Sequence, residues 1–507
     1  MAISLFNMQA LPFTSTPKIN HRHENSVPKP IFSRKFPCPW LEIGVFSTKK
    51  RAMMNVRPRA MSNSAPLTMD KPSGEGMNID KSLTGRWREI HGENNWAGLL
   101  DPMDPLLRSE LTRYGEMSQA CYDAFDNDPY SKYCGSCKYP RTELFVALDM
   151  EYHGYEVARY LYATSTIKLP NFFTQSKVPD VWSKYSNWIG FVAVSSDEMS
   201  KKLGRRDIVI CWRGTVTRVE WVHDWMVFLK PITENGIPSS DPNIKVESGF
   251  LDLYTDKQPD CPYSKFSVRE QVLSEIKHQM EVHQDEEISI TTTGHSLGSA
   301  LATLSAFDIA DVGIHIGRNG QPVPVTVFSF AGPRVGNMQF KDRLEGLGVK
   351  VLRVVNVRDV VPKTPGMVLN ENAMGLIKLT HAEARSYIHV GVELELDQKH
   401  SPYLKDTEDA GCCHDLEGYL HLLDGYHGKG KKFELATGRD IALVNKSCDF
   451  LKDEYLIPPA WQQEKNKGMM RGEDGRWILV ERPLLLDDHP DHTHDRLKQL
   501  GLAPLPQ

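Results

Sequence analysis

The sequence predicts an α/β fold in which helices flank a mostly parallel sheet. Three runs rich in β-branched and large apolar residues, at 287–293, 323–330 and 349–357, have the length and composition of strands. Helix-like segments separate them, and strands that alternate with helices pair in parallel through right-handed crossovers. A sharp, glycine-flanked turn joins the first strand to the helix-like run after it. We therefore expect the three runs to be neighbours in one sheet.

The turn Gly294-His295-Ser296-Leu297-Gly298 is the most informative motif. A serine at the apex of a strand–turn–helix unit is the nucleophile elbow of an α/β-hydrolase. Gly294 and Gly298 let the strand and the helix approach where a Cβ atom would collide. The N–H of Leu297 is expected to donate to the oxyanion of the reacting ester. The alternative interpretation is a tight turn whose serine only caps a helix.

A serine nucleophile needs a base and an acid that orients the base, and in this fold they follow in the order serine, acid, histidine. The strand-like run 349–357 ends at Arg358-Asp359-Val360-Val361-Pro362. An aspartate at the carboxyl end of a sheet strand lies where open α/β sheets place their sites. Asp359 is therefore the candidate acid, and the alternative is a loop aspartate that caps a turn.

The base is harder to choose, because the chain contains 18 histidines. His414 begins a short helix-like stretch, and His421 lies two turns later on the same face. His389, in a strand-like run, is a third candidate. The pattern by itself leaves these three alternatives open.

Five motifs, in this order, resemble those of the class 3 lipases, and among them the plant chloroplast acylhydrolases of phospholipase A1 type. They are Trp212-Arg213-Gly214-Thr215, Gly294-His295-Ser296-Leu297-Gly298, Ala331-Gly332-Pro333-Arg334-Val335-Gly336-Asn337, Asp359-Val360-Val361-Pro362 and His414-Asp415-Leu416-Glu417. The resemblance extends from about Thr84 to about Pro483. It implies Ser296 as nucleophile, Asp359 as orienting acid and His414 as general base. It also implies Thr215 as a second oxyanion donor beside the Leu297 amide.

The resemblance also implies the reaction. Such enzymes cleave the sn-1 acyl ester of glycerolipids, including phosphatidylcholine and galactolipids, with triacylglycerol as a further candidate. The products are a free fatty acid and a lysolipid, and neither a metal nor an organic cofactor is expected. A lipid acyltransferase and a catalytically silent lipase-like signalling scaffold are the alternatives. The intact serine, aspartate and histidine argue against the silent scaffold.

Residues 1–69 differ in composition from the rest of the chain. They carry ten Lys or Arg and two acidic residues, and they are rich in Ser, Thr and Pro. A basic, hydroxyl-rich leader that is poor in acidic residues is typical of an organellar transit peptide, and a disordered basic tail is the alternative. The resemblance favours the plastid, either its stroma or the surface of thylakoids or plastoglobules.

After the leader we expect three further regions. These are a helical extension at 70–185 that packs on the core, a lipase domain at 186–483 and a polar tail at 484–507. Helical spacing of apolar residues predicts a helix from Trp87 to about Phe125. Strand-like runs at 188–194 and 207–212 bracket a polar turn and predict a hairpin.

The segment 219–229, after the oxyanion loop, is rich in aromatic and large apolar residues. The resemblance implies a mobile lid over the acyl pocket, which would serve a lipid surface. An ordinary amphipathic core helix is the alternative. If the segment is a lid, activity is expected to rise sharply above the aggregation threshold of the lipid.

Composition limits the other functions. Charged residues make up 25% of the 507 residues, as is ordinary for a globular protein. There is no nucleic-acid motif, and no run of about 18 apolar residues predicts a transmembrane helix. We expect peripheral contact with glycerolipid at the lipid–water interface. Cys134-Gly135-Ser136-Cys137 has zinc or redox spacing, but a structural zinc needs two more ligands, so plain thiols are expected.

Overall fold

The computed structural model describes residues 79–165, 173–179, 181, 184–216, 228–239, 241–365, 386–462, 469–479, 481 and 492–502. All of them belong to one compact unit, Gly74–Gln507. The predicted leader at 1–69 lies outside the described residues. The predicted lid at 219–229 also lies outside them, apart from its last two residues.

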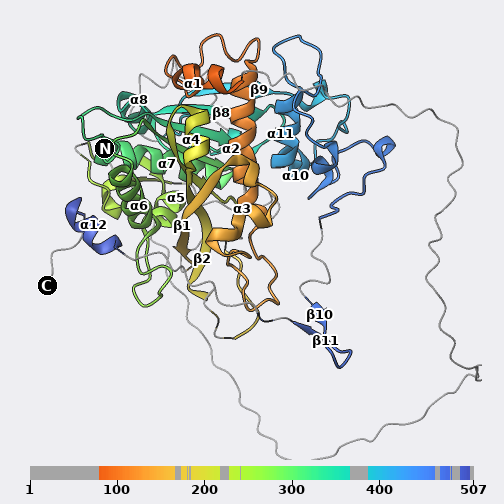
Figure 1. Cartoon of the computed structure of the whole chain (residues 1–507), viewed down its shortest axis with the longest axis horizontal. Coiled ribbons are helices and arrows are strands. Elements are labelled where there is room, and N and C mark those ends of the chain that lie inside the picture. Colours follow the sequence, from red (N-terminus) through yellow and green to blue (C-terminus); the bar gives the residue numbers. More distant parts are fainter. Residues whose placement is uncertain are drawn as a thin grey trace, which may run out of the picture. The chain divides into compact units, whose positions relative to one another are not determined.

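One seven-stranded sheet, of order β1-β2-β3-β6-β7-β8-β9, forms the centre of the described part of the chain. Its strands are β1 (Tyr155–Thr164), β2 (Ser186–Ser195), β3 (Arg206–Trp212), β6 (Ile288–His295), β7 (Val325–Phe330), β8 (Lys350–Asn356) and β9 (Val392–Leu396). The β1–β2 and β2–β3 pairs are antiparallel, and all later pairs are parallel. The predicted α/β-hydrolase fold with a mostly parallel sheet is confirmed (Figure 1).

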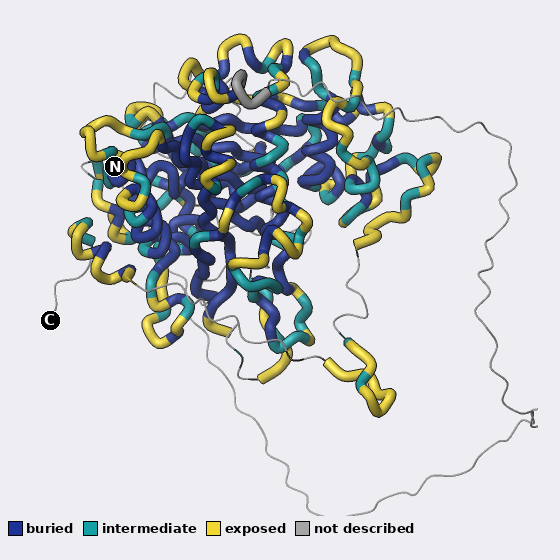
Figure 2. The backbone as a smooth tube through the Cα atoms, in the orientation of Figure 1, coloured by how far each residue is buried: buried dark blue, intermediate teal, exposed yellow. Residues whose placement is uncertain are grey.

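Two clusters of buried hydrophobic residues pack against the sheet. Four helices line the first cluster: α5 (Ser248–Thr255), α6 (Val268–Val282), α7 (Leu297–Val312) and α8 (Met338–Gly346). The helices that line the second include α1 (Ile79–Ile90), α2 (Pro105–Asp123), α4 (Asp197–Leu203) and α11 (Leu416–Gly425). Successive β3 residues alternate between the clusters, because side chains of a strand point to opposite faces. The buried interior is therefore continuous through the sheet (Figure 2).

Shorter elements surround this body. The strand pairs β4 (Leu229–Pro231) with β5 (Lys245–Glu247), and β10 (Met469–Arg471) with β11 (Trp477–Leu479), are antiparallel. The short helices are α3 (Leu144–Ala147), α10 (Ala410–Cys413) and α12 (Thr493–Gln499).

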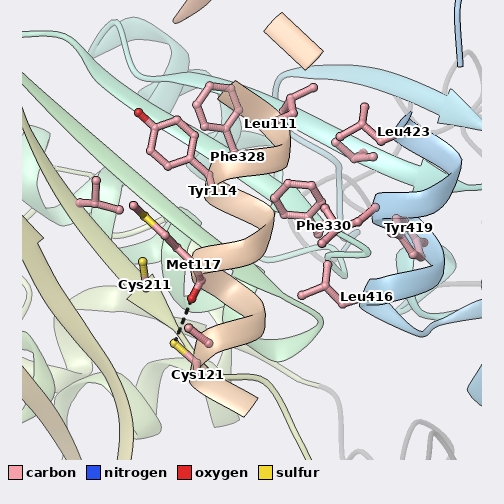
Figure 3. Close-up of a cluster of buried hydrophobic side chains, with 14 of the residues drawn as sticks. Leu111, Tyr114, Met117, Cys121, Cys211, Phe328, Phe330, Leu416, Tyr419 and Leu423 are labelled. Atoms are coloured by element: carbon pink, nitrogen blue, oxygen red, sulfur yellow. Dashed lines mark hydrogen bonds between the residues drawn. The ribbon is translucent and has the colours of Figure 1, made fainter. Parts of the chain in front are cut away.

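The helix predicted from Trp87 to Phe125 is two helices, α1 and α2. The chain leaves α1 after Ile90, and α2 begins only at Pro105. Asp104 caps α2 by accepting the N–H groups of Leu106 and Leu107, and proline at the first position suits a helix start. The apolar residues at helical spacing therefore belong to α2. They pack between the sheet and α11 (Figure 3).

The predicted hairpin of β2 and β3 does pair antiparallel, but a helix connects its strands instead of a simple turn. Ser196 caps α4 by accepting the N–H of Met199. Two acidic residues in the first turn and two lysines in the last turn complement the helix dipole. These local signals explain why the polar connection folds as a helix.

The expected region boundaries separate elements that pack together in the fold. The boundary at 185 falls between β1 and β2, which are paired, so the extension contributes the edge strand of the sheet. The expected polar tail contains α12, where Leu497 is buried and Thr493 accepts a hydrogen bond from Arg159. Described residues of both terminal regions therefore pack with the central sheet in one compact unit.

Nearly all of the cysteines in the described residues are buried, Cys134 and Cys137 included. No described helix combines the length and the hydropathy that crossing a bilayer requires.

Candidate active site

Ser296 occupies a strained turn between β6 and α7. Its backbone has φ 60° and ψ −128°, a combination that L residues rarely adopt. The N–H of Ser296 donates to the carbonyl of Phe330 on the neighbouring strand β7, at 2.9 Å. Conformations of this kind cost about 1–3 kcal/mol and persist only where the surroundings hold them. The turn therefore has the sharp geometry that the Gly-x-Ser-x-Gly pattern predicts.

Close backbone contacts explain the two glycines of the turn. A Cβ atom on Gly294 would lie 2.4 Å from the carbonyl carbon of Gly298. A Cβ atom on Gly298 would lie 2.4 Å from the carbonyl oxygen of Trp212, at the end of β3. Neither neighbour is a side chain that can rotate away. Glycine is thus required at both positions for the strand and the helix to meet at this angle.

His414 and Asp359 form a short, buried pair. The Nδ1 atom of His414 lies 2.6 Å from Oδ2 of Asp359, which follows β8. The Asp359 side chain is fully buried, and His414 is 7% exposed. Since a carboxylate accepts, Nδ1 carries the proton, and the lone pair of the neutral imidazole is on Nε2. The pair thus fixes the tautomer that a general base needs.

Two further donors hold the Asp359 carboxylate. The N–H of Val361 donates to Oδ1 at 2.9 Å, and the hydroxyl of Tyr419 on α11 donates to Oδ2 at 2.7 Å. The same tyrosine oxygen accepts the N–H of Asn356, the last residue of β8, at 3.0 Å. Burial raises the pKa of Tyr419, so it remains a donor. The acid is therefore anchored to both β8 and α11.

The backbone of His414 is also held. His414 lies in the break between α10 and α11, where its φ and ψ are −101° and 0°. Its carbonyl oxygen accepts a hydrogen bond from Nε2 of His295, at 2.8 Å, and the two rings are 4.5 Å apart. His295 directly precedes Ser296 in the chain. The structure thereby brings Ser296, Asp359 and His414 into one region.

Two reactive atoms in this region have no hydrogen-bond partner among the described residues. They are Oγ of Ser296 and Nε2 of His414, and both are buried. Buried polar groups in native proteins are normally paired, and exceptions are frequent at catalytic sites. An unpaired hydroxyl and an unpaired imidazole nitrogen in one region of the fold are suited to accept a substrate and to exchange a proton.

The two other candidate histidines have different partners. Nε2 of His421 lies 2.8 Å from the hydroxyl of Ser401, and burial lowers the pKa of His421 to about 4. Nε2 of His389 donates to the carbonyl of Pro362 at 2.7 Å. Burial lowers the pKa of His389 well below its ordinary value. Of the three, His414 is the one paired with Asp359.

The oxyanion candidates flank Ser296. Leu297 is the first residue of α7, where N–H groups lack partners within the helix. A Cβ atom on Gly214 would lie 3.2 Å from Cβ of Ser296, so the loop carrying Thr215 runs directly past the serine. Thr215 lines a pocket of about 670 Å³ together with His295 and His414. Another pocket, of about 710 Å³, lies near Ile288 at the other end of β6, away from these residues.

Sequence reasoning did not find Tyr122 and Tyr419. Tyr122, near the end of α2, has its hydroxyl 2.8 Å from Nδ1 of His295, and the two residues are 173 positions apart. Tyr419 and Asp359 are 60 positions apart. Neither tyrosine stands in a pattern that distinguishes it from an ordinary core residue of an amphipathic helix. Only the contacts between elements identify them.

Comparison with known proteins gives consistent relatives. The family model described as "Lipase (class 3)" matches residues 209–369. The chain is 59% identical over 426 residues to phospholipase A1-Igamma1, chloroplastic, of Arabidopsis thaliana, covering 83% of each chain. It is 55% identical over 432 residues to phospholipase A1-Igamma3, chloroplastic, of the same plant, covering 83% of this chain and 81% of the relative. It is 43% identical over 408 residues to phospholipase A1-II 6 of Oryza sativa subsp. japonica, covering 78% and 95%.

Proposed function

This chain belongs to the phospholipase A1 branch of the class 3 lipases, and we propose that Ser296, Asp359 and His414 are its catalytic triad. The enzyme is a lipid ester hydrolase. The observation that carries the assignment is the 2.6 Å contact of His414 with Asp359 beside the strained turn of Ser296. The proposed reaction is hydrolysis of the sn-1 acyl ester of a glycerolipid.

In the proposed first step, Oγ of Ser296 attacks the ester carbonyl while Nε2 of His414 takes the hydroxyl proton. Asp359 holds Nδ1–H and stabilises the imidazolium that forms. The carbonyl oxygen becomes an oxyanion, which accepts hydrogen bonds from the amide of Leu297 and from Thr215. Removal of one such donor typically raises the barrier by about 2.7–4 kcal/mol.

In the proposed second step, His414 returns the proton to the departing glycerol oxygen, and the lysolipid leaves. The acyl group is then esterified to Ser296. His414 deprotonates a water molecule, which attacks the acyl-enzyme. Collapse of this second tetrahedral intermediate releases the fatty acid and restores the serine hydroxyl.

The lining of the pocket beside His414 supports a head-group site. Besides the site residues it contains polar and charged side chains, among them Lys405, Asp409, Ser447 and Asp449. Such groups suit a hydrated head group better than an acyl chain. We propose phosphatidylcholine and galactolipids as substrates, met at the lipid–water interface. The relatives are named phospholipase A1, which supports the sn-1 position.

The proposed location is the chloroplast. Two of the relatives above are named chloroplastic, and residues 1–69 have the composition of a transit peptide. Within the plastid, the proposed working place is the surface of thylakoids or plastoglobules, where glycerolipid substrate is presented.

The direct test uses residues 70–507 and a Ser296→Ala control. Both proteins are incubated with phosphatidylcholine and monogalactosyldiacylglycerol that carry different acyl chains at the two positions, and products are identified by mass spectrometry. Release of the sn-1 acid by the wild type, and not by the variant, is expected. Equal release from both positions would overturn the regioselectivity. No release from either lipid by folded protein would overturn the proposed substrates.

A further inference from the structure

A second series of hydrogen bonds reaches the candidate base at its backbone carbonyl, whereas Asp359 contacts its ring. The hydroxyl of Tyr122 lies 2.8 Å from Nδ1 of His295, and Nε2 of His295 lies 2.8 Å from the carbonyl oxygen of His414. We propose that Tyr122 and His295 are positioning residues, which hold the peptide of His414 so that its ring stays aligned with Ser296. This inference rests on the catalytic triad proposed above.

The direction of both hydrogen bonds follows from the chemistry of the groups. A peptide carbonyl only accepts, so Nε2 of His295 must carry the proton that it donates to His414. Nδ1 of a neutral His295 is then an acceptor, and the hydroxyl of Tyr122 is its donor. The chain of bonds therefore runs one way, from Tyr122 through His295 to His414.

Tyr122 and His295 are suited to keep these protonation states during the reaction. Burial, reinforced by the neighbouring His414, lowers the pKa of His295 well below its ordinary value. Burial raises the pKa of Tyr122, which therefore keeps its proton. His414 must become positively charged during catalysis, and its ring is 4.5 Å from that of His295. A neutral His295 supports the peptide of His414 without repelling the imidazolium.

The pair joins segments that the fold would otherwise hold separately. His295 is the last residue of β6, next to Ser296, whereas His414 lies in a break between two helices. Tyr122 comes from α2, which crosses this face of the sheet. Gly214 leaves the space for it, because a Cβ atom there would lie 2.2 Å from the Tyr122 hydroxyl. Loss of the pair should let the base move relative to the nucleophile without dismantling either element.

The test measures kcat and KM for sn-1 release from phosphatidylcholine in mixed micelles. We expect kcat to fall about tenfold in His295→Leu and severalfold in Tyr122→Phe, with KM unchanged, because misalignment of reacting groups slows the chemical step. In His295→Gln, a terminal amide can donate to the His414 carbonyl, and kcat should largely recover. Tyr122→Phe should have no further effect in the His295→Gln background, since Nδ1 is absent there.

Tyr114→Phe is the matched control. Tyr114 lies on the same helix, is fully buried, and donates its hydroxyl to Asp207 at 2.8 Å, away from the site. Its loss should lower the melting temperature and leave kcat unchanged.

Two outcomes would overturn the positioning role, and a third would overturn the proposed function. An unchanged kcat in folded His295→Leu and Tyr122→Phe, with active wild type, overturns the positioning role alone. An equal fall of kcat in Tyr114→Phe shows a general effect of helix stability and also overturns it. Inactive wild type overturns the proposed function itself.

Discussion

Among single residues, Ser296 has a strained backbone, and His414 is restrained by hydrogen bonds at two points. Ser296 keeps a left-handed backbone because hydrogen bonding and two glycines hold the turn. His414 is held at its ring by Asp359 and at its carbonyl by His295. In the proposed reaction, such restraint keeps Ser296 and His414 near the productive geometry before substrate arrives.

Substitution of His414 and substitution of His421 should have different effects on kcat. His414→Ala is expected to lower kcat by about 10⁴-fold or more, because this variant lacks the proposed general base. His421→Leu should leave kcat within about twofold, because His421 contacts Ser401 and not the triad. Steady-state kinetics on phosphatidylcholine measures both, and comparable losses of kcat would contradict the choice of His414.

The His421→Leu variant should also change the pH dependence of stability. The pKa of the folded-state imidazole, about 4, lies below its ordinary value of 6.5, because burial disfavours the charged form. Protons therefore bind the unfolded chain preferentially as pH falls from about 6.5 to about 4, and stability is lost in that window. In urea denaturation, the free energy of unfolding of His421→Leu should fall less steeply than that of the wild type over this pH range. An equal slope in both proteins would disprove the low pKa of His421.

The elbow glycine has a matched control on the surface. In Gly298→Ala, the new methyl would meet the backbone of Trp212 at 2.4 Å, and we expect loss of both activity and soluble expression. In Gly346→Ala, at the end of α8, no atom lies within 4 Å of the new methyl, and stability should hold or rise by up to about 1 kcal/mol. Melting temperatures measure the difference, and a stable, active Gly298→Ala would contradict the close approach.

At the scale of elements, α2 connects the parts of the site. It lies in the cluster between the sheet and α11 (Figure 3). The hydroxyl of its Tyr122 lies 2.8 Å from Nδ1 of His295. Its Glu116 accepts hydrogen bonds from Tyr152 and Arg439, both at 3.0 Å, and lies 3.1 Å from Nε2 of His153. Because Arg439 also pairs with Glu417 on α11 at 2.7 Å, this cluster couples α2 to the segment of the base.

Glu116→Gln should remove an acid-sensitive part of the stability. Burial raises the pKa of Glu116, but His153 and Arg439 outweigh it and lower the pKa from 4.5 to about 2. Stability from this carboxylate is present above about pH 4.5 and is lost as pH falls to about 2; it amounts to about 3 kcal/mol. Urea denaturation from pH 7 to pH 3 should show a lower, flatter curve for the variant. The exposed Glu281→Gln is the control, and identical curves for Glu116→Gln and wild type would contradict the pairing.

Across the molecule, the sheet and the two hydrophobic clusters contain residues from all three regions that the sequence predicts after residue 69. β1 of the N-terminal extension pairs with β2, and α12 near the C-terminus packs through Leu497. Removal of residues 70–185 would therefore expose the sheet edge and the cluster that α1 and α2 cover.

The leader is expected to act independently of this body. Residues 1–69 fused to a fluorescent protein should deliver it to chloroplasts, and protein lacking them should keep its lipid hydrolysis. Confocal microscopy of leaf cells tests delivery to chloroplasts, and the mass-spectrometric assay tests lipid hydrolysis. A fusion that stays outside plastids would refute the transit peptide and leave the catalytic proposal intact.

Features that depend on neighbouring residues could be predicted from the sequence. The elbow could be predicted because Gly294, Ser296 and Gly298 lie within one turn, where steric limits act locally. The strands and Asp359 could be predicted because apolar runs and their ends are visible in the chain. The resemblance then singled out His414, which pattern alone had left open.

Contacts between distant residues could not be predicted from the sequence, because the packing of the elements brings these residues together. His414 contacts Asp359 across 55 positions and His295 across 119, whereas His421 on the same predicted face turns to Ser401. Tyr122 and Tyr419 carry no local signal, because a buried tyrosine on a helix is recognised as functional only by the group it contacts. The physical reason is that hydrogen bonds depend on distance in space to a few tenths of an ångström, and helix packing sets that distance across the sheet.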